Sequence, residues 1–182
     1  MKINGALINA AARTERKAFF PLFVDMNGRK ALIVGGGKVA ERRIKVLLDF
    51  GADITVISPE VTENIEHAAS VETICLLKRK YQEGDVAALT PFLVIAATDK
   101  REVNRAIMTE AKALNIHVSV ADCREECTCY FPAIADNGAY IAGLVSKDGN
   151  HAGVKQMAEK IKDMLRPHTE ARRARRTPRE FK

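Results

Sequence analysis

Three consecutive glycines, Gly35 to Gly37, directly follow the apolar residues 31–34 and precede a segment with helical periodicity. Gly35 would allow a tight turn after a strand, Gly37 would let the main chain approach a phosphate, and Ala40 stands where a third glycine would permit close helix contact. The N–H groups at the start of the helix would then face the phosphates. This order of residues predicts a site for a dinucleotide diphosphate.

The residues around the glycines supply the context that such a site requires. Residues 31–34 are continuously apolar, as in a central parallel strand, and residues 39–48 carry an apolar stripe at helical spacing. Gly51 ends this predicted helix, and residues 54–57 begin a second strand. A strand, a helix and a strand within about 30 residues form the βαβ unit in which the glycine pattern binds a dinucleotide.

The composition limits the remaining classes of protein. With 182 residues, 47% of them hydrophobic, the chain can bury one good core with a small appended piece. No apolar run approaches the roughly 20 residues of a membrane span, so we expect a cytoplasmic protein that does not bind a membrane. Much of the net charge of +6 falls in residues 166–182, which we interpret as a solvated basic tail. Because only 5% of the residues are aromatic, we expect no nucleic-acid partner.

The order of the predicted elements indicates an α/β fold: a Rossmann-like doubly wound parallel sheet, a small antiparallel element and a C-terminal helical piece. The last helix has a wider apolar face than a small domain needs, from which we infer contact with a partner chain. The segments that we expect are a flexible leader (1–18), a dinucleotide-binding domain (19–122), a hairpin region for dimerisation (123–149), a C-terminal helix (150–168) and a basic tail (169–182).

Local signals place further elements within these segments. Asn137-Gly138 lies between two apolar runs and predicts a hairpin, and Thr98-Asp99 is expected to cap a helix over residues 101–114. Cys75 lies in an apolar run and is interpreted as a small core residue. Strands besides those next to the glycines are expected over residues 19–24, 74–77, 92–97 and 116–121.

Polar residues follow several of the predicted strands. Because ligands of an open α/β sheet bind at the carboxyl ends of its strands, four segments are expected to meet there. Asp122 ends one of these strands, where a carboxylate beside a nicotinamide could act as a general base or acid; its alternative role is to cap a turn. The four segments are the glycine turn, Ser58-Pro59-Glu60, Thr98-Asp99 and Ala121-Asp122.

The end of the second strand leaves the mode of ribose binding open. Most NAD sites have an acidic residue there to hold the ribose hydroxyls, whereas this chain has Ser58, with Glu60 two positions later. Either Glu60 takes that role from the turn, or Ser58 and main-chain groups hold the ribose and Glu60 is only a charge at the start of a helix. No basic residue stands at this tip to bind the phosphate of NADP, so we expect NAD.

Several motifs together keep the order and spacing of a known family. They are Phe20-Pro21-Leu22-Phe23, the glycine segment 32–42, Ala96-Ala97-Thr98-Asp99, Val118-Ser119-Val120-Ala121-Asp122 and Phe131-Pro132-Ala133. Through these motifs, from about residue 20 to residue 165, the chain resembles the precorrin-2 dehydrogenase module of siroheme synthases. Motifs in register are more specific than the glycine pattern alone.

This resemblance implies a cytoplasmic homodimer with an NAD-binding domain and a smaller dimerisation part. It implies NAD-dependent oxidation of precorrin-2 to sirohydrochlorin in siroheme biosynthesis, and it leaves open whether iron or cobalt is then inserted into the product. By position, the family's cofactor contacts fall on Lys38, Val39, Pro59 and Glu60, and its essential aspartate falls on Asp122. The expected cofactor site therefore comprises Gly35, Gly37, Lys38, Val39, Ser58, Pro59, Glu60 and Thr98.

The chain departs from the family just before its last helix. The family has a glycine-rich Ser-Thr-Gly-Gly stretch followed by Ser-Pro, whereas residues 146–152 keep the serine and lose the proline. We align Ser146 with the family's serine and expect it to bind the substrate. The missing proline leaves the shape of the substrate pocket open.

Besides a dehydrogenase and nucleic-acid binding through the arginine-rich tail, two other hypotheses stand. One is an NAD-sensing regulatory module without catalysis, although such modules normally carry an acid where this chain has Ser58. The other is a chelatase whose dehydrogenase activity has lapsed, and Cys123, Cys127 and Cys129 could capture the metal in such a site. Their spacing is not that of a structural zinc site, so we interpret them as buried or reactive thiols, predict no metal site and leave their role open.

Overall fold

Five parallel strands form the sheet of the first part of the chain, in the order β3-β2-β1-β4-β5. The computed structural model describes residues 19–165. The strands are β1 (Lys30–Val34), β2 (Asp53–Ile57), β3 (Cys75–Leu77), β4 (Leu93–Ala96) and β5 (His117–Val120). The chain enters the sheet at the central strand β1, places β2 and β3 on one side of it, and then places β4 and β5 on the other side. This reversal confirms the Rossmann-like doubly wound sheet predicted from the sequence.

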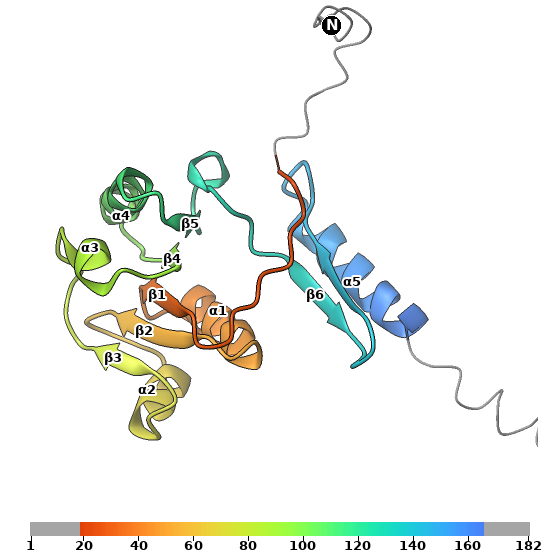
Figure 1. The fold of residues 1–182 in the computed structure, drawn as a ribbon, viewed down its shortest axis with the longest axis horizontal. Helices are drawn as coiled ribbons and strands as arrows, with labels where there is room; N and C mark the ends of the chain where they lie inside the picture. The colour runs from red at the N-terminus through yellow and green to blue at the C-terminus, as the bar shows by residue number, and fades with distance from the viewer. Residues whose placement is uncertain (1–18, 166–182) are drawn as a thin grey trace, which may run out of the picture. The chain divides into compact units, whose positions relative to one another are not determined.

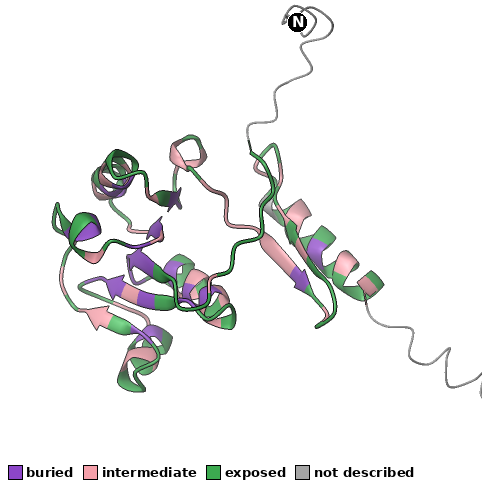
Figure 2. Ribbon diagram, in the orientation of Figure 1, coloured by how far each residue is buried: buried purple, intermediate pink, exposed green. Residues whose placement is uncertain are grey.

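Helices cover both faces of this sheet (Figure 1). Helices α1 (Lys38–Asp49) and α2 (Glu63–Ser70) lie on one face, and α3 (Asp85–Leu89) and α4 (Arg101–Ala113) lie on the other. Because side chains alternate along a strand, Leu32 and Val34 both point into the core beneath α3 and α4, where they join Val86 and Ile107. Strands β1, β2, β4 and β5 are the most continuously buried segments of this sheet, as Figure 2 shows. Their apolar residues on both faces explain why the sheet is parallel and central.

The chain divides into two compact units between Cys129 and Tyr130. In the second unit, β6 (Ala133–Asp136) and β7 (Ile141–Leu144) pair in antiparallel register. Gly138 has φ +82° in the turn between them. The side-chain oxygen of Asn137 accepts hydrogen bonds from the main-chain N–H groups of Ala139 and Tyr140. Helix α5 (His151–Leu165) packs against this hairpin. The predicted hairpin and final helix are confirmed.

Two expectations about single segments are wrong. Residues 19–24 form no strand, because β3 and β5 occupy the two edges of the sheet and Pro21 has no N–H to pair. The side chains of Phe20 and Phe23 are exposed. Cys75 is also exposed, because it begins a three-residue edge strand whose one neighbour is β2.

Within residues 19–165, no helix combines the length and apolar character that a membrane span needs.

A partly buried ion pair fixes the turn between β3 and α3. The Asp85 carboxylate accepts hydrogen bonds from Nη1 and Nη2 of Arg79, at 2.7 and 2.8 Å, and from the main-chain N–H of Gln82 at 2.8 Å. The bonds from Arg79, followed by that from Gln82, hold the pKa of Asp85 below its ordinary value of 3.8, against the opposing effect of burial. The ionised carboxylate therefore stabilises the folded state.

We expect Asp85→Asn to lower the free energy of unfolding by about 2 kcal/mol at about pH 7, because the charge-assisted bonds to Arg79 are lost. Since the folded protein holds this carboxylate at a lowered pKa, its contribution is present above pH 3.8 and disappears as the pH falls below that value. Urea unfolding of both proteins across this range checks the prediction. A stability difference that stays constant down to about pH 2 would contradict it.

Candidate functional site

The glycine turn joins β1 to α1 at the point where the strand order reverses. Gly35 has φ +121°, and its N–H donates a hydrogen bond to the carbonyl oxygen of Ile57 at 3.0 Å. A Cβ atom at this position would stand 2.2 Å from the carbonyl oxygen of Ala97. Only glycine therefore fits, both for its backbone conformation and for the space available. The tight turn predicted at Gly35 is confirmed.

The other two glycines have opposite surroundings. The carbonyl oxygen of Gly36 accepts a hydrogen bond from the N–H of Thr62 at 3.0 Å, and a Cβ at Gly36 would stand 2.1 Å from the carbonyl oxygen of Glu60. A Cβ at Gly37 would meet nothing within 4 Å. Gly36 thus packs the turn against the loop after β2, and Gly37 faces open space. The structural role of Gly36 was missed, because the glycine pattern assigns functions only to its neighbours.

The start of α1 leaves main-chain donors available. Gly37 is the N-cap residue, and no side chain caps the helix. The first N–H groups of a helix have no acceptor within it, so those of Lys38 and Val39 can bind an anion. The Lys38 ammonium lies 3.3 Å from Oε2 of Glu41, and Ala40 is fully buried, which allows the close helix contact expected there. An open turn and an uncapped helix start fit a dinucleotide diphosphate.

The loop after β2 bears on the two interpretations of ribose binding. The hydroxyl of Ser58 is buried and donates a hydrogen bond to the carbonyl oxygen of Glu60 at 2.6 Å. The side chains of Pro59 and Glu60 are exposed. Because the Ser58 hydroxyl is engaged within the loop, the geometry favours the Glu60 carboxylate as the group that can reach a ribose.

A buried asparagine fixes the loop after β4. The side-chain oxygen of Asn104 accepts hydrogen bonds from the N–H and the hydroxyl of Thr98, at 3.0 and 2.7 Å, and its amide donates to the carbonyl oxygen of Thr98 at 3.0 Å. The expectation that Thr98-Asp99 caps α4 is wrong, because Lys100 is the N-cap residue and Asn104 holds the Thr98 hydroxyl. Asn104 was not predicted to hold this loop. Its signal was a polar residue on the apolar face of the predicted helix.

Asp122 follows β5, at the same edge of the sheet as the glycine turn, because the carboxyl ends of parallel strands share one edge. Its side chain is 36% exposed, and its Oδ1 lies 3.5 Å from Nη1 of Arg101. The carboxylate is accessible and near one cation. This position suits a group that exchanges a proton with a ligand at this edge.

Ser146 belongs to the second unit. Its hydroxyl donates a hydrogen bond to Oδ1 of Asp148 at 2.5 Å and accepts one from the N–H of Asn150 at 2.7 Å. These bonds shape the turn that leads into α5. A contact between Ser146 and a substrate stays a prediction.

The segment after β5 lies along the edge of β5 that pairs with no other strand. The main-chain N–H of Val120 donates a hydrogen bond to Sγ of Cys127 at 3.2 Å, and the N–H of Val118 donates to the hydroxyl of Thr128 at 2.8 Å.

Burial raises the pKa of the Cys129 thiol to about 11. All four cysteines are free, and in the described part of the chain no cluster of three candidate ligands could hold a metal ion.

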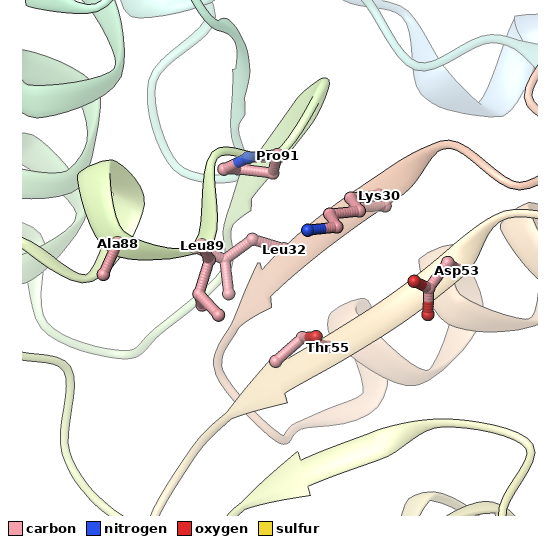
Figure 3. Close-up of a pocket in the computed structure, with 8 residues that line it drawn as sticks. Lys30, Leu32, Asp53, Thr55, Ala88, Leu89 and Pro91 are labelled. Carbon is pink, nitrogen blue, oxygen red and sulfur yellow. The ribbon is translucent and has the colours of Figure 1, made fainter.

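A small cavity of about 120 Å³ lies at the opposite end of the strands (Figure 3). Lys30 and Asp53, which begin β1 and β2, line it, and so do Leu89 at the end of α3 and Pro91 in the connection to β4. The glycine turn and Asp122 follow the carboxyl ends of their strands, so this cavity is separate from the candidate site.

The sheet topology and the glycine turn define the class of protein, a dinucleotide-binding Rossmann domain. Residues 22–133 match a family model described as "Putative NAD(P)-binding", and the chain belongs to this NAD(P)-binding family.

Similar proteins confirm the resemblance to siroheme synthases. The chain is 46% identical over 144 residues to "Probable multifunctional siroheme biosynthesis protein HemA" of Ruminiclostridium josui, covering 79% of this chain and 28% of the relative. It is 40% identical over 128 residues to the siroheme synthase of Ectopseudomonas mendocina, covering 70% of this chain and 27% of the relative. It thus spans less than a third of the length of these curated relatives.

A solved structure titled "SirC, precorrin-2 dehydrogenase" is also similar. Its TM-score is 0.66 at 26% sequence identity, and the match covers 80% of this chain and 71% of that one. The structural similarity therefore covers more of this chain than the NAD(P)-binding region, and it includes most of the SirC structure.

The two glycines with opposite surroundings provide a matched test of the site. We expect Gly36→Ala to lower the free energy of unfolding by about 2 kcal/mol, because its Cβ would overlap the main chain of the neighbouring loop. Gly37→Ala should fold like the wild type and bind NAD about tenfold more weakly, because its Cβ would occupy the approach to the diphosphate. Thermal melting and calorimetric titration with NAD measure both effects. Unchanged NAD affinity in folded Gly37→Ala would place the diphosphate elsewhere.

Proposed function

We propose that this chain is an NAD-dependent dehydrogenase that oxidises precorrin-2 to sirohydrochlorin in siroheme biosynthesis. One observation carries the proposal: the accessible Asp122 carboxylate lies at the sheet edge where the glycine turn leaves room for a diphosphate. Similarity to a solved precorrin-2 dehydrogenase supports it. We also propose that it acts in the cytoplasm, a reducing compartment in which its four cysteines would stay free.

The residues that would hold NAD follow from the geometry of the turn. The main-chain N–H groups of Lys38 and Val39 bind the diphosphate, and the open side of Gly37 lets it approach. Glu60 accepts hydrogen bonds from the ribose hydroxyls, with Pro59 beside it, and would repel the additional phosphate of NADP. Thr98, in the loop after β4 at the same edge of the sheet, would complete the cofactor site.

The chemistry requires two transfers from the macrocycle. Oxidation of precorrin-2 breaks a C–H bond as a hydride leaves and releases one proton. Bound NAD supplies the hydride acceptor. The Asp122 carboxylate accepts the proton and, being partly exposed, passes it to solvent. We assign the carboxylate-rich tetrapyrrole as substrate and Ser146 as one of its hydrogen-bonding contacts.

Metal insertion into sirohydrochlorin is a second candidate activity. The name of one relative includes the word "multifunctional", and insertion also requires a group that accepts protons from the pyrrole nitrogens. Asp122 is available for that step. Incubation of sirohydrochlorin with Fe²⁺ or Co²⁺ in the absence of NAD tests it directly, and insertion no faster than the spontaneous reaction would exclude it. A regulatory module that only senses NAD would have no proton transfer for the accessible Asp122 carboxylate to perform.

The exposed apolar side chains of the second unit support a homodimer. Tyr140, Val145, Met157 and Met164 are exposed, Met164 to 80%. An apolar surface of this kind on a hairpin and its helix is typical of an interface. We propose that a second copy of the chain covers it.

We expect Asp122→Asn to reduce the rate of NAD-dependent precorrin-2 oxidation by about a hundredfold or more, because the proton acceptor is lost. NAD binding should be unchanged. Absorbance spectroscopy of the tetrapyrrole measures the rate, and Asp49→Asn, which alters an exposed carboxylate at the end of α1, is the matched control. Full activity of the Asp122 variant would refute its role, and absence of NAD-dependent oxidation by the wild type would refute the proposed function.

We expect the wild type to sediment as a dimer and Val145→Asp to sediment as a monomer, because a charge would be buried in the proposed interface. Val71→Asp, which alters an exposed valine of the first unit, should remain dimeric. Analytical ultracentrifugation distinguishes these results. A monomeric wild type at micromolar concentration, or a dimeric Val145 variant, speaks against this interface.

A further inference from the structure

One arginine connects the candidate proton acceptor to a second acid. Arg101 begins α4, and its Nη1 lies 3.5 Å from Oδ1 of Asp122. Its Nη2 forms an ion pair with Oε1 of Glu126, the last residue of the short 3₁₀ helix η1 (Arg124–Glu126). The three side chains thus join the start of α4 to the segment that follows β5.

The two ion pairs differ in strength. Glu126 is the less exposed of the two acids, with 19% of its side chain accessible against 36% for Asp122. The hydrogen bond from Arg101 lowers the pKa of Glu126, so this pair remains ionised. The contact with Asp122 is longer. Glu126 therefore anchors the guanidinium, and Asp122 lies at its outer side, where a ligand can reach it.

The guanidinium group suits this arrangement. It is planar and rigid, and its two terminal nitrogens can face two carboxylates at once, whereas an ammonium group is a point charge. Both terminal nitrogens of Arg101 face protein carboxylates. Among the described residues, Arg101 is the one side chain paired with Asp122. A substrate carboxylate would therefore have to compete with two acids for this cation.

We propose that Arg101, anchored by Glu126, is a positioning residue that orients the Asp122 carboxylate for proton transfer. The inference rests on the dehydrogenase activity proposed above. Arg101 acts through Asp122 and not through contact with the substrate. It therefore contributes to the chemical step and leaves the strength of substrate binding unchanged.

The first test compares two arginines of the same helix. We expect Arg101→Gln to lower kcat for precorrin-2 oxidation about tenfold while KM stays within about twofold. Arg105→Gln removes the same charge one turn further along α4 and should behave like the wild type, since Arg105 is exposed, forms no ion pair with Asp122 or Glu126 in the described part of the chain, and lowers the pKa of Glu126 less than Arg101 does. Arg101→Lys should recover part of the lost kcat. Equal kcat in the Arg101→Gln and Arg105→Gln variants, or a rise in KM alone, would overturn the inference.

The second test asks whether Arg101 acts through Asp122. In the Asp122→Asn background, Arg101→Gln should cause no further loss of the residual rate, because there is no carboxylate left to orient. An additional tenfold loss would show that Arg101 acts on another group and would overturn the inference.

Glu126→Gln provides a variant that keeps both Arg101 and Asp122. It should lower kcat about threefold with unchanged KM, because the guanidinium loses its anchor. This variant and Arg101→Lys also decide the matter if thermal melting shows that Arg101→Gln does not fold; unchanged kcat in both would overturn the inference. A wild type without turnover would defeat the proposed function itself, whereas an active wild type with unaffected variants defeats only the role of Arg101.

Discussion

Main chain touches main chain at the carboxyl edge of the parallel sheet, and the rest of the first unit depends on this close approach. Gly35 lies against the carbonyl oxygen of Ala97, and Gly36 lies against that of Glu60, with no room for a Cβ at either position. Three loops that are distant in sequence are thereby joined. Their conformational entropy is lost during folding, so a ligand that binds at this edge does not have to order them.

Each loop is also held by polar bonds of its own. Ser58 bonds within the loop after β2, and Asn104 bonds to three groups of Thr98 in the loop after β4. These bonds satisfy buried polar groups that would otherwise destabilise the fold. Polar groups that remain accessible, above all the main chain at Gly37 and the carboxylates of Glu60 and Asp122, are then the ones available to a ligand.

Most of the fold could be predicted because its signals are local. The strand and helix around the glycines follow from apolar periodicity, and the turn at Gly138 follows from two adjacent residues. The errors at residues 19–24 and at Cys75 arose because composition alone does not tell which strand occupies the edge of a sheet.

The candidate site was only partly predictable, for a related reason. Sequence patterns indicated Gly35 and, together with its position in the family, Asp122. Gly36, Asn104 and Arg101 gain their roles from partners across the fold. In each of these cases the residue type was visible in the sequence, but the partner was set by the way parallel strands bring their loops together.

The hydrogen bonds from β5 to Cys127 and Thr128 have a consequence for how the domain behaves in a crowded solution. An outer strand with unsatisfied amides invites pairing with another polypeptide, and the described segment closes that border with a sulfur and a hydroxyl oxygen. The Cys127 thiol therefore helps to cover the edge of the sheet at β5, so that no further strand can pair there. Within the five-stranded sheet, β3 is then the edge strand that remains open to such pairing.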